Sequence, residues 1–120
     1  QKTLFLGYSN GANMLAAMMQ LHPALVRKAV LLRAIKVLEE ALSPDLRGVD
    51  ILSLTGDRDL FGSLAPQLED ELRLAGARLV AERVAAGHEA GTGDIKAIQS
   101  WLRDLERQSD GALETGTGRI

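Results

Sequence analysis

The sequence predicts an α/β fold, a parallel sheet with flanking helices. Two observations lead to this prediction. Apolar runs of strand length alternate along the chain with segments whose apolar residues recur at helical spacing. Glycine, proline and aspartate residues, which favour turns, separate these segments. Strands that alternate with helices in this way imply right-handed crossovers and a parallel sheet, here with four strands and about three main helices.

The chain begins with a predicted strand, a sharp turn and a helix. The apolar run KTLFL predicts a strand at Lys2–Leu6, and Asn10–Leu21 carries apolar residues at helical spacing. The dipeptide His22-Pro23 is expected to end this helix, because the residue before a proline is disfavoured in helical geometry.

The rest of the chain continues the alternation. Further strands are expected at Ala29–Arg33, Ile51–Thr55 and Arg78–Val84, and further helices at Leu64–Ala75 and Asp94–Leu105. The first of these strands is apolar throughout, as expected for a strand covered on both faces, whereas the last alternates and is expected at a sheet edge. Between Ala34 and Gly48 we expect an excursion with a short helical patch.

One domain is expected over residues 1–107. The segment Gln108–Ile120 is polar and glycine-rich, which predicts a disordered tail. The first residue is not methionine and a strand begins almost at once, so a fragment or a processed chain is expected.

Composition limits the classes of function. The chain has 120 residues, 46% of them hydrophobic and 25% charged, with a net charge of −2, as in an ordinary soluble globular protein. It has no basic cluster of the kind that nucleic-acid binding requires, and no apolar run near the roughly 20 residues needed to span a bilayer. Without cysteine, disulfides and thiolate metal sites are excluded. We expect a cytoplasmic protein that uses no cofactor and no metal.

The stretch GYSNG, from Gly7 to Gly11, matches the pattern G-x-S-x-G. In this pattern the glycines let the chain turn sharply from a strand into a helix, so that the serine projects outward as a nucleophile. The predicted strand before Ser9 and the predicted helix after it supply the expected context. The dinucleotide-binding pattern lacks its second glycine here, and the phosphate-binding loop lacks its Gly-Lys pair. The alternative is a plain glycine-rich turn.

A serine hydroxyl needs a base to remove its proton, and the chain has two histidines. His22 lies at the far end of the predicted helix, about 20 Å from Ser9 at a rise of roughly 1.5 Å per residue. His88 lies in a loop after the last strand, and loops that follow parallel strands emerge at the same edge of the sheet. We therefore expect His88 to be the base, with a solvated turn histidine as the alternative.

An acid must orient the histidine and stabilise its charged form. The turn after the third strand, GDRD, offers Asp57 and Asp59 at the same sheet edge. Either could serve, and a solvated turn is the alternative. The chain order serine, aspartate, histidine is that of α/β-hydrolases rather than that of chymotrypsin or subtilisin.

Four stretches together resemble the C-terminal half of bacterial carboxylesterases of the phospholipase/carboxylesterase group of α/β-hydrolases: GYSNGANMLAAMMQLHP, AVLLRA, LTGDRD and AGHEAGTGDIKAIQSWL. The resemblance covers about residues 2–102 and implies that the chain forms the last four strands of that fold. It implies Ser9 as nucleophile and His88 as base, and it favours Asp59 over Asp57 as the acid. It also implies that the backbone N–H of Asn10, which follows the nucleophile, is one donor of an oxyanion hole.

The chain also departs from this family. Relatives often have proline where Leu60 stands and a Pro-Met pair where Ala34-Ile35 stand, so the shape of the substrate pocket is expected to differ. Tyr8, Leu60 and Phe61, together with the excursion around Ile35–Leu42, are candidates to line an apolar pocket, with simple packing as the alternative. The second oxyanion donor is expected in an N-terminal half that this chain lacks.

These observations predict a serine hydrolase that cleaves carboxylic esters, as carboxylesterases and lysophospholipases do, through an acyl-enzyme on Ser9. The alternative is a catalytically inactive hydrolase half or a partner-dependent α/β module. The expected partner is a small-molecule ester, with no nucleic acid and no membrane span. The first strand is expected to be an apolar edge, which favours a homo-oligomer or pairing through this strand.

Overall fold

The structure is a computed structural model that describes residues 3–34, 45–59 and 64–118, with side chains up to Gln108. The described part contains one parallel sheet with the strand order β1-β2-β3-β4. The strands are β1 (Phe5–Tyr8), β2 (Lys28–Leu32), β3 (Asp50–Gly56) and β4 (Arg78–Val84), and the helices are α1 (Asn10–Leu21), α2 (Ala65–Leu74) and α3 (Thr92–Gly118). The predicted α/β class with a parallel sheet is confirmed.

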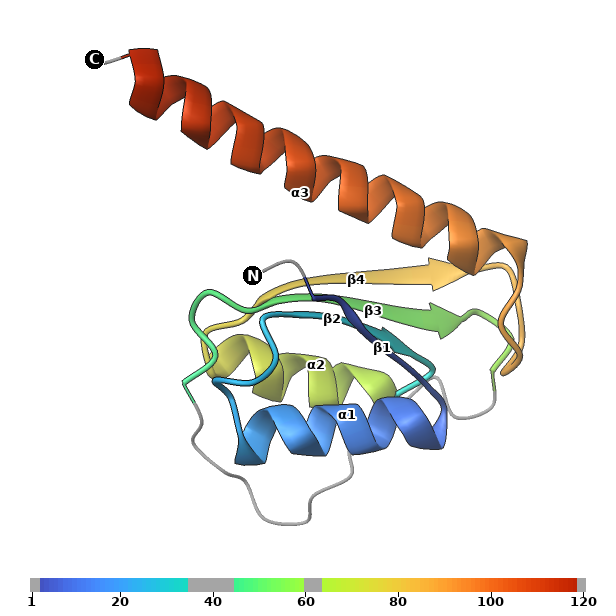
Figure 1. Cartoon of the computed structure of the whole chain (residues 1–120). Helices are drawn as coiled ribbons and strands as arrows, with labels where there is room; N and C mark the ends of the chain where they lie inside the picture. Colours follow the sequence, from blue (N-terminus) through green and yellow to red (C-terminus); the bar gives the residue numbers. More distant parts are fainter. Residues whose placement is uncertain (1–2, 35–44, 60–63, 119–120) are drawn as a thin grey trace.

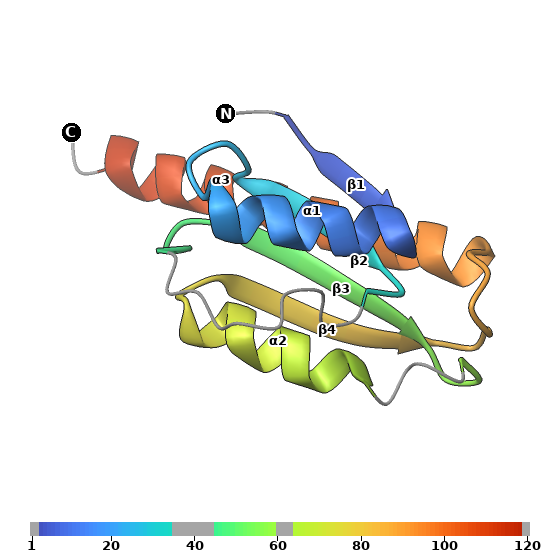
Figure 2. The same cartoon turned by 90° about the horizontal axis from the view of Figure 1, so that it is seen from below.

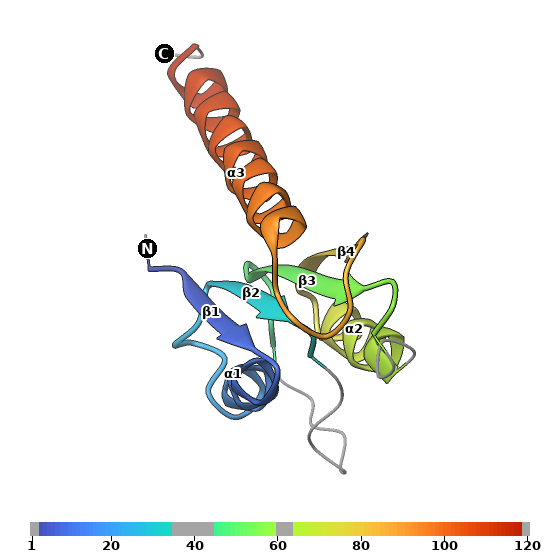
Figure 3. The same cartoon turned by 90° about the vertical axis from the view of Figure 1, so that its right-hand side faces the viewer.

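The elements form three layers with the sheet in the middle (Figure 1). Helices α1 and α2 cover one face, seen in front in Figure 2, and α3 crosses the other face, as the end view in Figure 3 shows. One apolar cluster, which includes Met19, Ile51 and Leu72, joins the first two helices to the sheet. A second cluster packs Leu52 against Trp101 of α3. All four strands end on the same side of the sheet, where α1 and α3 begin (Figure 1).

Burial follows the strand order. Strand β3 is buried along its whole length, and in β2 every residue after Lys28 is buried, as expected for interior strands covered on both faces. Strand β4 is mostly exposed and lies at one edge, as predicted. Strand β1 forms the other edge but spans Phe5–Tyr8 rather than 2–6, because Gly7 and Tyr8 continue the pairing with β2 although their hydropathy does not mark them as strand residues.

Helix α3 is longer than the sequence predicts. Its apolar stripe ends near Leu105, and the polar segment after it is predicted to be a disordered tail, whereas the backbone stays helical to Gly118. Extending an existing helix needs only one more hydrogen bond per residue fixed, so an amphipathic pattern does not by itself mark a helix end.

Two expectations lie outside the described residues: the short helical patch in Ile35–Leu42, and the pocket residues Leu60 and Phe61. Within the residues that the structure describes, no helix is long and apolar enough to cross a membrane.

Candidate active site

Ser9 occupies a sharp turn between β1 and α1. Its φ of 56° and ψ of −116° lie in a region that non-glycine residues rarely adopt. The turn is held by main-chain hydrogen bonds: the Ser9 N–H donates to the Leu32 carbonyl at 2.8 Å, and the Ser9 carbonyl accepts from the Asn13 N–H at 3.0 Å. The serine is thus presented at the carboxyl edge of the sheet, at the N-terminus of a helix.

The two glycines of GYSNG have different environments. A Cβ atom at Gly7 would lie 2.6 Å from the Gly11 carbonyl oxygen and 2.8 Å from backbone atoms of Ala12, so only glycine lets α1 pack this closely on β1. A Cβ atom at Gly11 would meet nothing within 4 Å. The steric requirement of the turn therefore falls on Gly7.

The structure brings Ser9, His88 and Asp59 together in one chain of hydrogen bonds. The distance from Ser9 Oγ to His88 Nε2 is 2.7 Å, and that from His88 Nδ1 to Asp59 Oδ2 is 2.8 Å. Because a carboxylate can only accept, the ring proton belongs on Nδ1, which leaves Nε2 to accept the proton of the serine hydroxyl. The Asp59 side chain is 3% exposed, whereas the His88 side chain is 40% exposed. The buried carboxylate can orient the imidazole, while part of the ring remains exposed to solvent.

Asp57 and His22, the other candidates for acid and base, lie elsewhere. The Asp57 carboxylate accepts from the Ala86 backbone N–H at 3.1 Å, and Asp57 is exposed. His22 caps the far end of α1, where its backbone N–H donates to the Met18 carbonyl, and it is exposed. Asp59 is therefore the aspartate of this turn that contacts the histidine.

Asn10 is the first residue of α1. The first backbone N–H groups of a helix have no partner within the helix and form its positive end. The Asn10 amide is thus available, by its place in the fold, as a donor for negative charge that develops beside Ser9.

The loop 85–91, here called the His88 loop, must cross the sheet to reach Ser9. Strands β1 and β4 are opposite edges, and three strand spacings of about 4.8 Å separate them by about 14 Å. The loop first passes the end of β3, where a Cβ atom at Gly56 would overlap the carbonyl oxygens of Ala86 and Gly87. Glycine at this position lets the loop lie directly on the sheet edge.

Arg33, directly after β2, binds the His88 loop where the loop passes the end of β2. Its guanidinium is fully buried and forms a bidentate ion pair with Asp94, at 2.7 and 2.8 Å. The same guanidinium donates to the carbonyl oxygens of Gly87 at 3.0 Å and Glu89 at 2.9 Å, on either side of His88. Like Ser9, Arg33 has a positive φ, 62°.

Asp94 is a buried carboxylate in the first turn of α3. Burial raises the pKa of Asp94, but hydrogen bonds from Arg33 and from the Gly91 N–H, with the charge of Arg33, outweigh burial and hold this pKa below its ordinary value. Sequence reasoning missed both members of this pair. The signal for Arg33 is a charged residue that ends an apolar run, and the signal for Asp94 is an acid in the first turn of a helix.

Tyr8, the last residue of β1, contacts the His88 loop at the edge of the sheet. The sequence suggests that it lines a substrate pocket, whereas its hydroxyl donates to the His88 carbonyl at 2.9 Å and its ring lies 5.8 Å from the imidazole, centroid to centroid. A role in lining a pocket stays a prediction, since the Tyr8 side chain also remains partly exposed.

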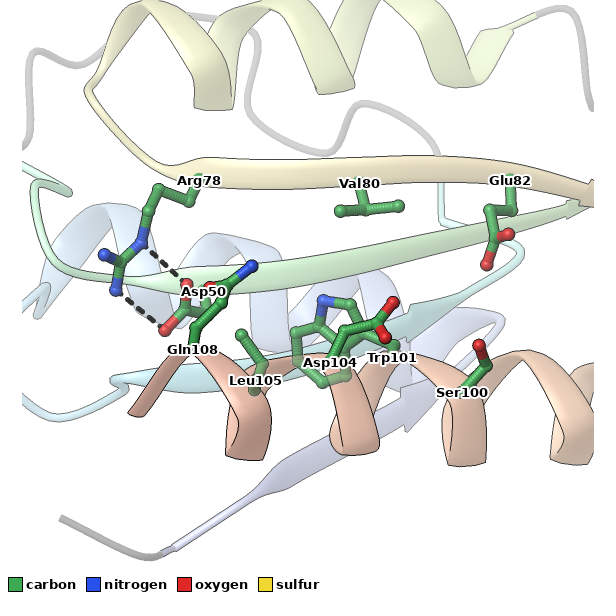
Figure 4. Close-up of a pocket in the computed structure, with 9 residues that line it drawn as sticks. All are labelled: Asp50, Arg78, Val80, Glu82, Ser100, Trp101, Asp104, Leu105 and Gln108. Atoms are coloured by element: carbon green, nitrogen blue, oxygen red, sulfur yellow. Dashed lines mark hydrogen bonds and ion pairs between the residues drawn. The ribbon is translucent and has the colours of Figure 1, made fainter. Parts of the chain in front are cut away.

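The described residues also form grooves outside this constellation. One, of about 410 Å³, is apolar and open, and is lined by Phe5, Leu6, Gly11, Met14, Leu15 and Met18. Another, of about 200 Å³, lies between β4 and α3, and an Asp50–Arg78 ion pair lies at one end of it (Figure 4). Among the described side chains, no group of three or more histidine, aspartate and glutamate residues could hold a metal ion.

A serine on a strained turn between strand and helix, at the carboxyl edge of a parallel sheet, defines the α/β-hydrolase class. The described chain has part of that fold. It is similar to a carboxylesterase from Mesorhizobium loti, with 40% identity and a TM-score of 0.81 over 83% of this chain and 48% of that one. A protein of unknown function from Agrobacterium tumefaciens is 32% identical, with a TM-score of 0.75 over 84% of this chain and 50% of that one.

A carboxylesterase from Bacillus cereus has the same fold at 22% identity, with a TM-score of 0.79 over 84% of this chain and 49% of that one. The chain thus spans about half the length of the solved structures that it matches. Neither a protein-family model nor a curated protein matches the sequence.

Proposed function

We propose that this chain carries the nucleophile, base and acid of a serine hydrolase that cleaves carboxylic esters. The observation that carries the proposal is the hydrogen-bonded series Ser9, His88, Asp59, in which both ring nitrogens of the histidine are used. Similarity to a carboxylesterase at 40% identity supports the class of substrate.

The first half of the reaction acylates the serine. As Ser9 Oγ attacks the ester carbonyl, its proton passes to His88 Nε2, and the charged imidazolium is stabilised by the Asp59 carboxylate. The carbonyl oxygen becomes an oxyanion beside the Asn10 N–H and the positive end of α1. Collapse of this intermediate breaks the ester C–O bond, and the alcohol leaves with the proton that His88 returns.

The second half releases the acid. Water attacks the acyl group on Ser9 while His88 Nε2 takes one of its protons. The new tetrahedral intermediate collapses, the serine oxygen recovers its proton from His88, and the carboxylic acid leaves. The partial exposure of the imidazole supports this step, because water can reach the site from the side of the ring that is open to solvent.

A fluorophosphonate probe tests the nucleophile directly, because it reacts with activated serines irrespective of the natural ester. We expect one modified site, located at Ser9 by mass spectrometry, and none in Ser9→Ala. The matched control is Ser100→Ala, an exposed serine on α3, which should be labelled at the wild-type rate. A folded wild-type chain that never reacts with the probe would contradict the proposal.

The alternative, a catalytically inactive or partner-dependent module, is favoured by one observation. Leu6 on the edge strand β1 is 55% exposed, and Met14 on α1 is 72% exposed, beside the open apolar groove. Contiguous exposed apolar surface of this kind marks an interaction site. Under this alternative, Ser9 is inert to the probe in the folded, isolated chain and becomes reactive only when this surface is covered.

A further inference from the structure

Three successive carbonyl oxygens of the His88 loop each accept a hydrogen bond from a side chain of another element. Arg33 Nε donates to Gly87, the Tyr8 hydroxyl donates to His88 itself, and Arg33 Nη2 donates to Glu89, at 3.0, 2.9 and 2.9 Å. The donors come from the ends of β2 and β1, the two strands that the loop crosses last.

These hydrogen bonds fix the orientation of His88, which side-chain packing alone does not fix. The His88 side chain is 40% exposed, so neighbouring atoms enclose only part of the ring. A loop residue keeps two soft backbone dihedrals unless its peptide groups are held, and a displacement of about 1 Å of a catalytic group can cost about 10²-fold in rate. Donors to the carbonyls before, at and after His88 hold the peptide groups that set the direction of its side chain.

Arg33 is itself rigidly held. A planar guanidinium presents its donors in a fixed fork, and here one edge binds both oxygens of Asp94 while other N–H groups bind the loop. Asp94 also accepts from the Gly91 N–H at 2.9 Å, so the same carboxylate fixes the end of the loop where α3 begins. A buried ion pair is stable only with such additional hydrogen bonds.

We propose that Tyr8 and the Arg33–Asp94 pair are positioning residues for His88, which hold its Nε2 at Ser9 through the carbonyls of the loop. This inference rests on the proposed serine-hydrolase function. Tyr8 directly precedes the nucleophile, so its hydroxyl also couples the turn that carries Ser9 to the loop that carries the base.

The first test is kinetic and uses Tyr8→Phe and Asp94→Asn with the fluorophosphonate probe. Tyr8→Phe removes only the hydroxyl of a partly exposed ring, so the fold is retained. One hydrogen bond contributes about 1 kcal/mol, so we expect the maximal rate of inactivation to fall about 5-fold in Tyr8→Phe, and further in Asp94→Asn. The probe concentration at half-maximal rate should stay constant. An increase in that concentration with an unchanged maximal rate would overturn the proposal, because it indicates a substrate-lining role for Tyr8.

The second test does not need activity. The chain has two histidines, so ¹⁵N NMR of labelled histidine resolves His88 with His22 as an internal reference. In the wild type we expect the His88 ring to carry its proton on Nδ1 alone. In Tyr8→Phe and Asp94→Asn we expect a mixture of ring tautomers at His88 and no change at His22. Variants that keep the wild-type His88 spectrum would overturn the proposal, even if they are less stable.

The matched control for Asp94→Asn is Asp50→Asn. Asp50 pairs with Arg78 in a similar bidentate geometry, at 2.7 and 2.9 Å, but at the start of β3 and β4, away from the His88 loop (Figure 4). We expect Asp50→Asn to leave both the labelling rate and the His88 spectrum unchanged. If the wild type does not react with the probe, the proposed function fails, and the NMR comparison still decides whether these residues position His88.

Discussion

Ser9 Oγ lies 2.7 Å from His88 Nε2, although the two residues are 79 positions apart and follow strands at opposite edges of the sheet. The contact depends on the path of the His88 loop along the carboxyl edge. At β3 the loop packs on Gly56, at β2 it is bound by Arg33, and at β1 it accepts from Tyr8. The ends of β3, β2 and β1 thus all contact the loop that brings the base toward the nucleophile.

The two aspartates of the GDRD turn should differ sharply in their effect on catalysis. Asp59→Asn removes the carboxylate that orients His88 Nδ1, and we expect kcat/KM for a p-nitrophenyl ester to fall about 10⁴-fold, as for the corresponding change in a serine protease triad. Asp57→Asn is the control, because its carboxylate accepts from a backbone N–H instead. We expect it to cost less than about 10-fold. Equal losses in the two variants would contradict the assignment of the acid.

Gly56→Ala should separate the acid-bearing turn from the His88 loop. The added methyl group would overlap the Ala86 and Gly87 carbonyl oxygens, and relief requires the loop to move. Overpacking of this kind costs about 1–3 kcal/mol, which urea unfolding would detect, and the labelling rate at Ser9 should fall as well. The control is Gly91→Ala in the same loop, where a Cβ atom meets nothing within 4 Å. A wild-type urea midpoint in Gly56→Ala would show that the loop does not need this close approach.

The stability of the protein should fall in acid partly because of Asp94. The pKa of Asp94 is lowered in the folded state, so its contribution is fully present above its ordinary unfolded pKa of about 4 and is lost as the pH falls through the lower, folded value. Asp94→Asn leaves Arg33 as an unpaired buried charge and should lower the free energy of unfolding by about 3 kcal/mol at neutral pH. The difference in the free energy of unfolding between the wild type and Asp94→Asn should shrink as the pH falls below about 4.

Urea unfolding between pH 2 and pH 7 measures this dependence. The control is Asp45→Asn, because Asp45 pairs with Arg47 in full solvent, and hydrogen bonds from Arg47 lower the pKa of Asp45 to about 2. We expect the exposed pair to contribute little at any pH. A parallel offset of the Asp94→Asn and wild-type curves across this range would show that the ionisation of Asp94 is not involved.

The predicted pairing through the first strand can be tested by adding charge to the apolar surface around β1. Leu6→Lys and Met14→Lys place a cation on exposed positions, so the stability should change by less than about 0.5 kcal/mol. We expect light scattering to report weaker self-association in both variants. Leu74→Lys, on a strongly exposed residue of α2, is the control and should behave like the wild type. Identical association of all three variants would exclude this surface as the contact.

The elements and their order follow from hydrophobic periodicity. The interior strands β2 and β3 are the most clearly predicted, because burial on both faces requires continuous apolar runs. Ser9 and His88 were predictable as neighbours because loops after parallel strands share one edge of the sheet. The choice between Asp57 and Asp59 was open on residues alone, since both aspartates lie in the same turn. The sequence does not show which of the two side chains points toward His88.

The positioning contacts could not be predicted from the sequence in the same way. Arg33 ends an apolar run and reads as the last residue of a strand, and Asp94 reads as an ordinary acid in the first turn of a helix. Their ion pair joins residues 61 positions apart, and no local pattern specifies such a pairing. The role of Tyr8 depends on the path of the His88 loop, which only the three-dimensional structure describes.

The open space beside Gly11 has a practical consequence. The chain contains no cysteine, and a side chain at position 11 would meet nothing within 4 Å. Gly11→Cys would therefore create a unique attachment point for a fluorophore or spin label two residues from Ser9. A label there could follow acylation of the serine and coverage of the neighbouring apolar groove in the same molecule.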